Sequence, residues 1–360
     1  MRVLHMIPDI GISNGVMSVI LNYFKAMPED IKFDVVYFSE TEKTRQADIE
    51  ALGGRVFKID APSPKDLITG KMNSFFEMHP DEWQALHIHC PHFAVFIAPY
   101  AKKHGIHKIA MHCHSTWYSL DPKNNFRNKM LYLMGSRMVD TKFACGKAAG
   151  HFWYGSDKNF TVLPNAIDCD KFRYDEEIRN KKREELGLKD SFIVGHLGRV
   201  SPPQKNHTFL LKVFSQIKKK KENAVLLMAG AEKNEELDAL SKQLGIEKDI
   251  FFLGARTDVC ALCQAYDLFL FPSFWEGLPV SVVEAQAAGL PVVMSDSVTD
   301  EVCVTDHIIS LPLSESPEIW AQRALAFSEQ KNRYTFDLMK KSGWDIYECA
   351  ERLVKYYKNH

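Results

Sequence analysis

Short runs of apolar residues recur along the chain and alternate with longer segments in which apolar residues return every three or four positions. The short runs have the length of buried strands, and the longer segments have the period of amphipathic helices. Strands that alternate with helices in this way predict parallel sheets with both faces covered. In the first half, strands are expected near residues 2–10, 32–40, 55–60, 85–90, 107–115, 140–146 and 160–168.

A second series of strands and helices begins near residue 190. Residues 169–189, between the two series, are highly charged and have few apolar anchors, which predicts a linker with its approach helix. The pattern therefore predicts two α/β domains, residues 1–168 and 190–343, followed by a helix with an apolar face at about 344–360. Strands of the second domain are expected near residues 191–200, 223–230, 249–254, 265–273 and 290–296.

Composition changes this picture little. The chain has 360 residues, of which 46% are hydrophobic and 25% charged, as in ordinary globular proteins of two domains. A net charge of −1 gives no overall attraction to nucleic acid. No apolar run reaches the ~18 residues of a membrane-spanning helix, and the first residues resemble a strand more than a signal peptide. Eight scattered cysteines favour a reducing, cytoplasmic location.

The charge is unevenly distributed. Residues 100–147 contain nine Lys or Arg and two Asp, a net charge of +7. Within this stretch, residues 125–138 mix cations with Met, Leu, Phe and Tyr, which predicts a face that lies against an anionic membrane surface. An ordinary helix packed on the sheet explains the same pattern, and both interpretations stay open.

Two carboxylates stand out in residues 271–294, which have the pattern of a strand end, a loop, a helix and the next strand. Pro279 lies where a helix can begin, and Gly289 lies just past the helical pattern. Glu276 falls in the loop and Glu284 in the helix. Both side chains can face the crevice at the carboxyl end of the strand, where open α/β sheets bind ligands.

This segment resembles the E-x7-E signature of retaining nucleotide-sugar glycosyltransferases of the family 4 type, which have the GT-B fold. The resemblance implies two Rossmann-like domains that face each other across a cleft, with the helix at 344–360 crossing back onto the first. It implies that the second domain holds a nucleotide diphosphate sugar, with UDP expected, and that a hexose is transferred with retention. Residues 284–296 and 205–207 look most like bacterial enzymes of exopolysaccharide or capsule synthesis, which implies a lipid-linked or oligosaccharide acceptor.

The resemblance also assigns roles within the motif. It implies that Glu276 accepts hydrogen bonds from hydroxyls of the transferred sugar and that Glu284 binds the two ribose hydroxyls. Backbone N–H groups of Gly277, Leu278 and Val280 are expected to meet the diphosphate at the helix start.

Further donor-binding residues lie upstream. Arg199 and Lys205 are expected to stabilise the negative charge that grows on the leaving diphosphate, a task that fixed cations perform without a metal. No cofactor is therefore expected. Gly230 ends a strand and is a weaker donor-binding candidate, and the loop at 255–259, which contains Arg256, is placed to hold the base.

The first domain carries the acceptor-side candidates. Asn14 and Gly15 form a turn before a helix whose N-terminus offers N–H groups to an anion. His112 and His114 would share one face of a strand. By resemblance, His114 lies beside the sugar and the acceptor, so the catalytic candidates are Glu276, His114, Arg199 and Lys205.

Other residues favour a structural role. His87, His89 and His92 suggest a metal site, but no acidic residue stands close in sequence, so no metal is expected; His5 and His87 fit buried core positions. Asn165 and Asp267 are expected to be structural. Cys260 and Cys263 form a lone CxxC without a second pair, which argues against zinc or redox chemistry.

Rival functions remain open. A sugar-nucleotide epimerase of the same fold should lack E-x7-E, whereas a non-catalytic nucleotide-sugar-binding subunit would keep Glu284 without turnover. A dinucleotide-dependent oxidoreductase needs G-x-G-x-x-G after a first strand, and neither half of the chain has it.

Overall fold

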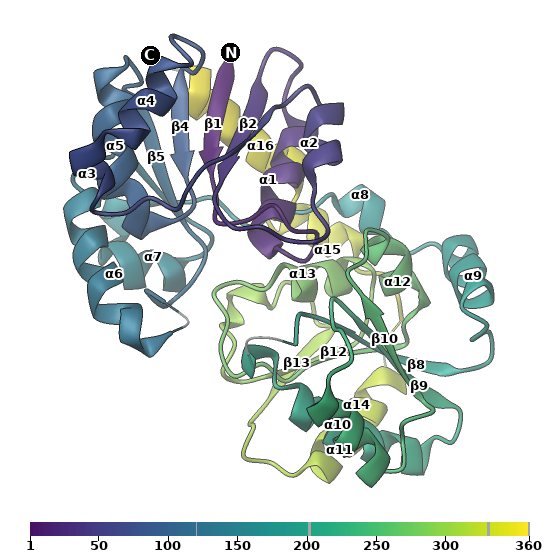
Figure 1. Cartoon of the computed structure of the whole chain (residues 1–360). Helices are drawn as coiled ribbons and strands as arrows, with labels where there is room; N and C mark the ends of the chain where they lie inside the picture. Colours follow the sequence, from purple (N-terminus) through teal and green to yellow (C-terminus); the bar gives the residue numbers. More distant parts are fainter. Residues whose placement is uncertain (120, 201–202, 330–331, 359–360) are drawn as a thin grey trace. The chain divides into compact units, whose positions relative to one another are not determined.

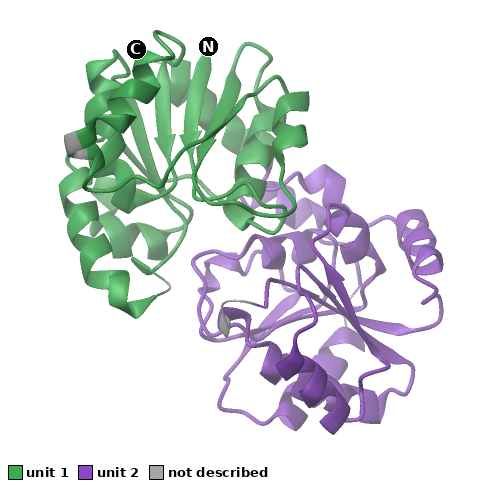
Figure 2. Ribbon diagram, viewed as in Figure 1, with its two compact units in different colours: residues 1–166, 346–360 green, residues 167–345 purple. Residues whose placement is uncertain are grey.

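The computed structural model describes residues 1–119, 121–200, 203–329 and 332–358. The chain divides into two compact units, one of residues 1–166 with 346–360 and one of residues 167–345 (Figures 1 and 2). Each unit is built around a parallel sheet flanked by helices, so the two Rossmann-like sheets expected from the sequence are confirmed. The sequence pattern predicts a first domain of residues 1–168 with the helix at 344–360, and a second domain of residues 190–343.

Unit 1 contains a seven-stranded sheet of order β3-β2-β1-β4-β5-β6-β7. The order reverses direction between β1 and β4, which creates a switch point at the carboxyl ends of these strands. The strands are β1 (Arg2–Met6), β2 (Lys32–Tyr37), β3 (Val56–Lys58), β4 (Ala85–Ile88), β5 (Lys108–Cys113), β6 (Thr141–Ala144) and β7 (Thr161–Val162). The helices are α1 (Gly15–Ala26), α2 (Gln46–Ala51), α3 (Asp66–Thr69), α4 (Lys71–Glu77), η1 (Pro91–Phe93), α5 (Ala94–Lys103), α6 (Pro122–Gly135), α7 (Lys147–Tyr154), η2 (Asp157–Asn159) and α16 (Ile346–Lys358).

The C-terminal helix α16 belongs to unit 1, as expected. Its buried positions Ile346, Cys349, Leu353 and Tyr357 recur at helical spacing, so they form one apolar face. This face packs beside α1. The hydroxyl of Tyr357 lies 2.7 Å from Nδ1 of His87 on β4, which ties the end of the chain to the middle of the sheet.

Unit 2 contains a six-stranded sheet of order β10-β9-β8-β11-β12-β13, with its switch point between β8 and β11. Strands β9 and β11 are apolar throughout because helices cover both faces of the sheet. The strands are β8 (Phe192–Leu197), β9 (Ala224–Ala229), β10 (Ile250–Gly254), β11 (Leu268–Phe271), β12 (Val292–Ser295) and β13 (Ile308–Leu311). The helices are α8 (Cys169–Phe172), α9 (Glu176–Glu185), η3 (Pro203–Lys205), α10 (His207–Lys220), α11 (Glu235–Gln243), α12 (Val259–Ala265), α13 (Val280–Ala287), η4 (Asp300–Val302), α14 (Pro317–Glu329) and α15 (Phe336–Lys341).

Two strands differ from the expectation. The sequence pattern does not single out β13, an edge strand that pairs with β12. Its burial is uneven because it lies at the edge of the sheet, so its apolar signal is weak. In contrast, the strand expected at 160–168 is reduced to Thr161–Val162, since the following residues turn through Pro164.

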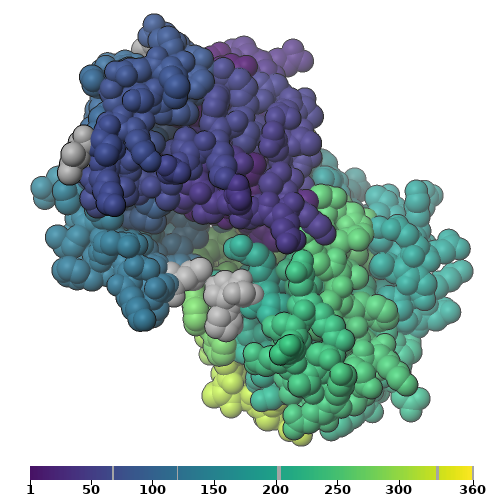
Figure 3. Space-filling model, viewed as in Figure 1, coloured from purple at the N-terminus to yellow at the C-terminus, as the bar shows by residue number. Residues whose placement is uncertain are grey.

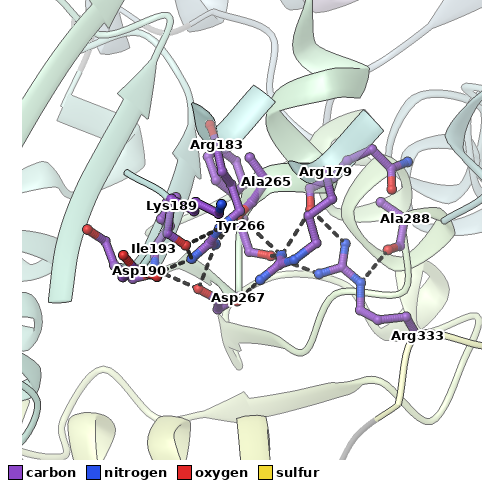
Figure 4. A network of polar contacts seen from close by, with 12 residues as sticks. Arg179, Arg183, Lys189, Asp190, Ile193, Ala265, Tyr266, Asp267, Ala288 and Arg333 are labelled. Carbon is purple, nitrogen blue, oxygen red and sulfur yellow. Dashed lines mark hydrogen bonds and ion pairs between the residues drawn. The ribbon is translucent and has the colours of Figure 1, made fainter. Parts of the chain in front are cut away.

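Residues 169–189, expected to be a linker with its approach helix, form α8 and α9 and belong to unit 2. Two arginines of α9 bind Asp267, which directly precedes β11 (Figure 4). Arg183 Nη1 lies 3.1 Å from the Asp267 carboxylate, and the carboxylate also accepts from the Ile193 N–H at 2.7 Å. Asp267 therefore has the structural role expected of it, and α9 is held by charge more than by apolar contact.

The same cluster satisfies the carbonyl groups at the end of α12, which have no partner within their own helix. Arg179 Nη1 donates to the carbonyl oxygens of Gln264, Ala265 and Tyr266 at 3.1, 3.2 and 2.8 Å. Arg333 donates to the Tyr266 oxygen as well, at 2.8 Å. Burial lowers the pKa of Arg333 to about 10, which still leaves the guanidinium charged at neutral pH.

Within the part of the chain that the structure describes, no helix combines the length and the apolar character needed to cross a membrane.

The Asp267 cluster predicts a large loss of stability when its acid is removed. Asp267→Ala leaves two guanidinium groups and one N–H without their partner, so we expect a loss of about 3 kcal/mol in the free energy of unfolding. Glu222→Ala, at an exposed acid of the same unit, is the control and should change stability by less than ~0.5 kcal/mol. Urea denaturation measures both; equal stabilities of the two variants would contradict the role given to Asp267.

Candidate active site

The carboxyl ends of β8 and β11, at the switch point of unit 2, bring together two of the expected catalytic residues. Lys205 Nζ lies 2.8 Å from Glu276 Oε1. The two side chains are 19% and 9% exposed, so the pair is largely screened from water. Lys205 Nζ also lies 4.4 Å from the centre of the Phe271 ring, a cation–π contact with the last residue of β11. A cation and a carboxylate are thus held at the position where a ligand is expected.

Glycines make room for this arrangement. A Cβ atom on Gly198, at the end of β8, would lie 2.9 Å from Cγ of Lys205. The Lys205 side chain therefore packs against Gly198 in space that any larger residue would fill. The candidate Gly230 follows β9 with a φ of +80°, which favours glycine. Its N–H donates to the Gly254 carbonyl at 2.6 Å. Backbone without side chains therefore lines the ends of β8, β9 and β10.

The remaining motif residues lie at the start of α13. Gly277 and Leu278 are buried in the loop after Glu276, and Val280 is the first residue of the helix. Glu284 lies within the helix and is half-buried. Burial raises the pKa of the Cys263 thiol on α12, and the nearby negative charge of Glu284 raises it further. The two glutamates therefore occupy a loop and a helix as the sequence predicts, and their ligand roles stay a prediction.

Two glutamines that the sequence analysis did not single out hold this region in place. Gln204 accepts from the Phe274 N–H at 2.9 Å through its carbonyl and donates to the Trp275 oxygen at 2.8 Å through its side chain. Gln286 of α13 is fully buried and binds the Val302 oxygen at 2.7 Å and the Thr305 N–H at 3.1 Å. No spacing rule marks such amides, since their partners are backbone groups far away in sequence.

The two arginine candidates differ. Arg199 is exposed just after β8 and forms no ion pair with the residues that the structure describes, so its guanidinium is open to an anion. Arg256 is engaged: its Nε and Nη2 bind the two oxygens of Asp258 at 2.7 and 2.6 Å. Arg256, backed by Lys182, holds the pKa of the Asp258 carboxyl far below its usual range. A nucleotide base bound in this loop would therefore contact an Arg256–Asp258 ion pair with no net charge.

In unit 1, Asn14 caps α1. Its side-chain oxygen accepts from the N–H groups of Val16 and Met17 at 3.0 and 3.3 Å, and its amide donates to the Asp9 oxygen at 2.9 Å. The Asn14 side chain is therefore committed to the helix start. Gly15 is exposed as the first residue of α1, with open space where a side chain would be.

The histidines of unit 1 form a connected cluster at the carboxyl ends of β1, β4 and β5. Nδ1 of His114 lies 2.9 Å from Oδ1 of Asn165, Nε2 of His114 lies 2.9 Å from Nδ1 of His89, and Nε2 of His89 lies 3.0 Å from Nδ1 of His5. The candidate His112 stacks beside His114, with ring centres 4.1 Å apart, so these two share one face as expected. Nε2 of His112 binds the Leu163 oxygen at 3.1 Å.

The donors and acceptors along this row of histidines follow from its last partner, the side-chain oxygen of Asn165. An amide oxygen only accepts, so His114 carries its proton on Nδ1. Burial lowers the pKa of His114 to about 4 and that of His5 to about 3, so these rings are neutral at pH 7. His114 Nε2 must then accept from His89, and His89 in turn accepts from His5. Both nitrogens of His114 are engaged, and a sugar hydroxyl can reach them only by displacing a partner.

Two sets of three histidines have ring nitrogen atoms within 4.8 Å of one another. The first set is His5, His87 and His89, and the second is His89, His112 and His114. Imidazole lone pairs lie in the ring plane, and the rings of His87 and His89 are only 4° from parallel at 4.6 Å. Parallel planes do not converge on one ion, whereas zinc requires ligands that do, which argues against a metal at the first set. In the second set the rings are tilted by 27° to 39°, but Nε2 of His112 and both nitrogens of His114 already have hydrogen-bond partners. Hydrogen bonding explains this cluster better than metal ligation, and metal independence stays a prediction.

Comparison with known proteins places this site in a family. Residues 178–311, which include β8, Lys205, Glu276 and Glu284, match the model of the family "Glycosyl transferases group 1". The chain therefore carries a domain of the group 1 glycosyltransferases. Its two parallel-sheet units are those of the GT-B fold, and the expected glycosyltransferase of family 4 type is supported by the family match and the relatives.

Relatives extend this similarity along the whole chain. EpsF of Bacillus subtilis is 29% identical over 374 residues, covering 99% of this glycosyltransferase and 96% of EpsF. The Escherichia coli UDP-Gal:alpha-D-GlcNAc-diphosphoundecaprenol alpha-1,3-galactosyltransferase is 30% identical over 148 residues, which is 40% of this chain and 38% of that protein. The crystal structure of Anabaena Alr3699/HepE in complex with UDP and glucose shares the fold, with a TM-score of 0.82 at 17% identity and full coverage of both chains.

The neutral histidine chain predicts that this glycosyltransferase loses stability in mild acid. In the unfolded chain His114 takes up a proton near pH 6.5, whereas in the folded chain it does so near pH 4. The unfolded state therefore binds more protons between these values, and stability falls as the pH falls. His114→Gln should remove about 2 kcal/mol of the loss between pH 7 and pH 5.

Urea denaturation at both pH values measures this change, with His107→Gln, at an exposed histidine of unit 1, as the control. A pH dependence in His114→Gln equal to that of the unchanged protein would show that His114 is not held neutral.

Proposed function

We propose that this glycosyltransferase moves a hexose from a UDP-sugar to a lipid-linked glycan acceptor, with retention of the anomeric configuration, in bacterial polysaccharide assembly. The observation that carries the donor side is the Lys205–Glu276 pair, 2.8 Å apart at the switch point beside α13. A nucleotide sugar needs both partners, a cation for its diphosphate and a carboxylate for its sugar hydroxyls.

The comparisons support the substrates. The Escherichia coli relative is named for UDP-Gal and a diphosphoundecaprenol acceptor. A Campylobacter jejuni relative, 33% identical over 141 residues, is named as a transferase to a diphospho-undecaprenol-linked sugar. The structural neighbour from Anabaena was solved with UDP and glucose. These substrates are properties of those proteins, and we extend them to this chain as part of the proposal.

The structure also favours one account of retention. In a same-face reaction, the bond from the anomeric carbon to the diphosphate oxygen breaks, the acceptor oxygen bonds to the same carbon, and the acceptor proton moves to the leaving phosphate. His114 is the alternative proton acceptor, but its two nitrogens are already hydrogen bonded to Asn165 and His89. We therefore assign the proton to the phosphate. A polar contact of His114 with the sugar or acceptor requires that it first gives up Asn165 or His89.

Helix α6 supports contact with a membrane, where a lipid-linked acceptor resides. Phe126, Met130, Leu133 and Met134 recur along one face of the helix and are 76%, 45%, 45% and 52% exposed. The helix lies on the outside of unit 1 (Figures 1 and 3). An exposed apolar face with basic neighbours is the composition of a helix that lies in an anionic membrane interface. The basic neighbours are Lys123, Arg127, Lys129 and Arg137.

The donor assignment predicts separate losses in two variants. Lys205→Met should reduce kcat/KM for the UDP-sugar by about 10²-fold, since it removes a fixed charge from the leaving group. Glu276→Gln should reduce turnover to a similar degree. Lys212→Met, at an exposed lysine on α10, is the matched control and should stay within about twofold of the unchanged enzyme.

A panel of UDP-sugars, scored for transfer and hydrolysis with and without a chelator, measures these effects. Turnover that persists under chelation agrees with metal independence. Near-normal turnover in both variants would contradict the donor site, and UDP binding without turnover on any sugar would favour a non-catalytic subunit.

The exposed apolar face of α6 predicts that variants on this helix lose binding to anionic vesicles. Phe126→Ser combined with Met134→Ser should weaken sedimentation with phosphatidylglycerol vesicles by about tenfold or more, since both side chains would leave the interface. Tyr334→Ser, at a residue of unit 2 that is 85% exposed, serves as the control. Binding of the unchanged protein should weaken with salt. Binding that salt leaves unaltered, or that the double variant retains, would count against α6 as the membrane face.

A further inference from the structure

The loop between β11 and α13 exposes two adjacent aromatic rings. Phe274 and Trp275 are 43% and 39% exposed, whereas every other residue from 272 to 279 is buried or half-buried. Their ring centres lie 5.9 Å apart and their planes differ by 26°, so the two rings lie nearly parallel and form one apolar patch. Large aromatic side chains in water are unfavourable, and an adjacent pair in a binding loop indicates a ligand.

This surface is held rigidly. The Phe274 N–H donates to the Gln204 oxygen at 2.9 Å, and the Gln204 side chain donates to the Trp275 oxygen at 2.8 Å. On one side of the pair the Ser273 oxygen accepts a hydrogen bond from Ser295, and on the other Glu276 is bound by Lys205. Since the backbone is fixed on both sides, a ligand meets the rings without first having to order the loop.

The chemistry beside the rings selects the ligand. A pyranose ring has one or both faces lined by C–H groups, which pack on aromatic rings, and an edge of hydroxyls, which donate to carboxylates. Phe274 and Trp275 offer the first partner. Glu276, the next residue, is assigned to hydroxyls of the transferred sugar, so a pyranose on the adjacent rings lies next to that sugar, where the acceptor must be. We propose that Phe274 and Trp275 form a stacking platform for a pyranose ring of the acceptor glycan, an inference that rests on the proposed glycosyl transfer.

A lipid surface fits this loop less well. An anionic membrane requires free cations beside the apolar residues, and Lys205, whose ammonium contacts Glu276 of this loop at 2.8 Å, is neutralised by that contact. The rings also form a patch of only two residues, whereas the exposed apolar face of α6 carries four such residues among basic ones. The platform and the membrane face are therefore separate surfaces with different partners.

The test uses the full chain labelled with 5-fluorotryptophan. Of the six tryptophans, the fluorine signal missing from Trp275→Phe identifies Trp275. Methyl glycosides of glucose, galactose and N-acetylglucosamine are titrated in the presence of UDP, and UDP binding is measured in the same samples by calorimetry. We expect at least one glycoside to shift the Trp275 signal saturably. Phe274→Ala should weaken that binding by about tenfold, the loss typical of removing an aromatic anchor.

Phe251→Ala, at a phenylalanine of the same unit that is 39% exposed, is the matched control and should leave the titration unchanged. A Trp275 signal that responds to none of the glycosides, or that responds only to phosphatidylglycerol vesicles, overturns the platform. If such a sample still binds UDP and turns over a UDP-sugar, the proposed function stands without the platform. If it binds no UDP either, the donor site fails first and the platform with it.

Discussion

Strand β11 sets the main electrostatic constraint of unit 2. The strand is buried along its whole length, so the charges that flank it must lie just outside its two ends. Asp267 precedes it and Glu276 follows it, and each is neutralised by a cation from elsewhere in the chain, Arg183 and Lys205 among them. An unpaired charge at such partly buried positions would cost several kcal/mol. The pairing that lets unit 2 fold therefore also delivers the cation and the carboxylate of its candidate site.

Unit 1 meets the same constraint with neutral groups. At the switch point between β1 and β4, polar side chains are again buried, but they are imidazoles whose pKa values lie well below neutrality. Three of them form a directed chain that ends on an uncharged amide, Asn165. Under the proposed function, the switch point of unit 2 attracts the anionic nucleotide sugar, and the switch point of unit 1 offers hydrogen bonding without charge. This division suits a reaction whose donor carries a diphosphate and whose acceptor supplies a hydroxyl.

The sequence predicted those features that depend on local spacing. The parallel sheets, the apolar face of α16 and the positions of Glu276 and Glu284 on loop and helix all follow from short-range patterns. Lys205 was paired with the motif only through a family resemblance, because 71 residues separate it from Glu276. The tautomer of His114 could not be predicted, since it depends on the register that places His5 opposite His87. The contacts of residues 169–189 with unit 2 could not be predicted, because Arg179 and Arg183, which resemble a solvated surface in the sequence, are partners of Asp267.

The Lys205–Glu276 pair bears on how the proposed reaction gains rate. Without ligand, each side chain satisfies the other, so both are fixed in position before a donor arrives. When the diphosphate binds Lys205 and the sugar hydroxyls bind Glu276, these contacts replace the Lys205–Glu276 ion pair. The two side chains need to move little for this exchange. As the bond to the anomeric carbon breaks, negative charge grows on the diphosphate, and the attraction of Lys205 grows with it. The carboxylate contacts neutral hydroxyls, whose charge changes less. Lys205 therefore stabilises the transition state more than the bound substrate, which is the condition for catalysis, whereas Glu276 chiefly holds the sugar at the place where that difference takes effect.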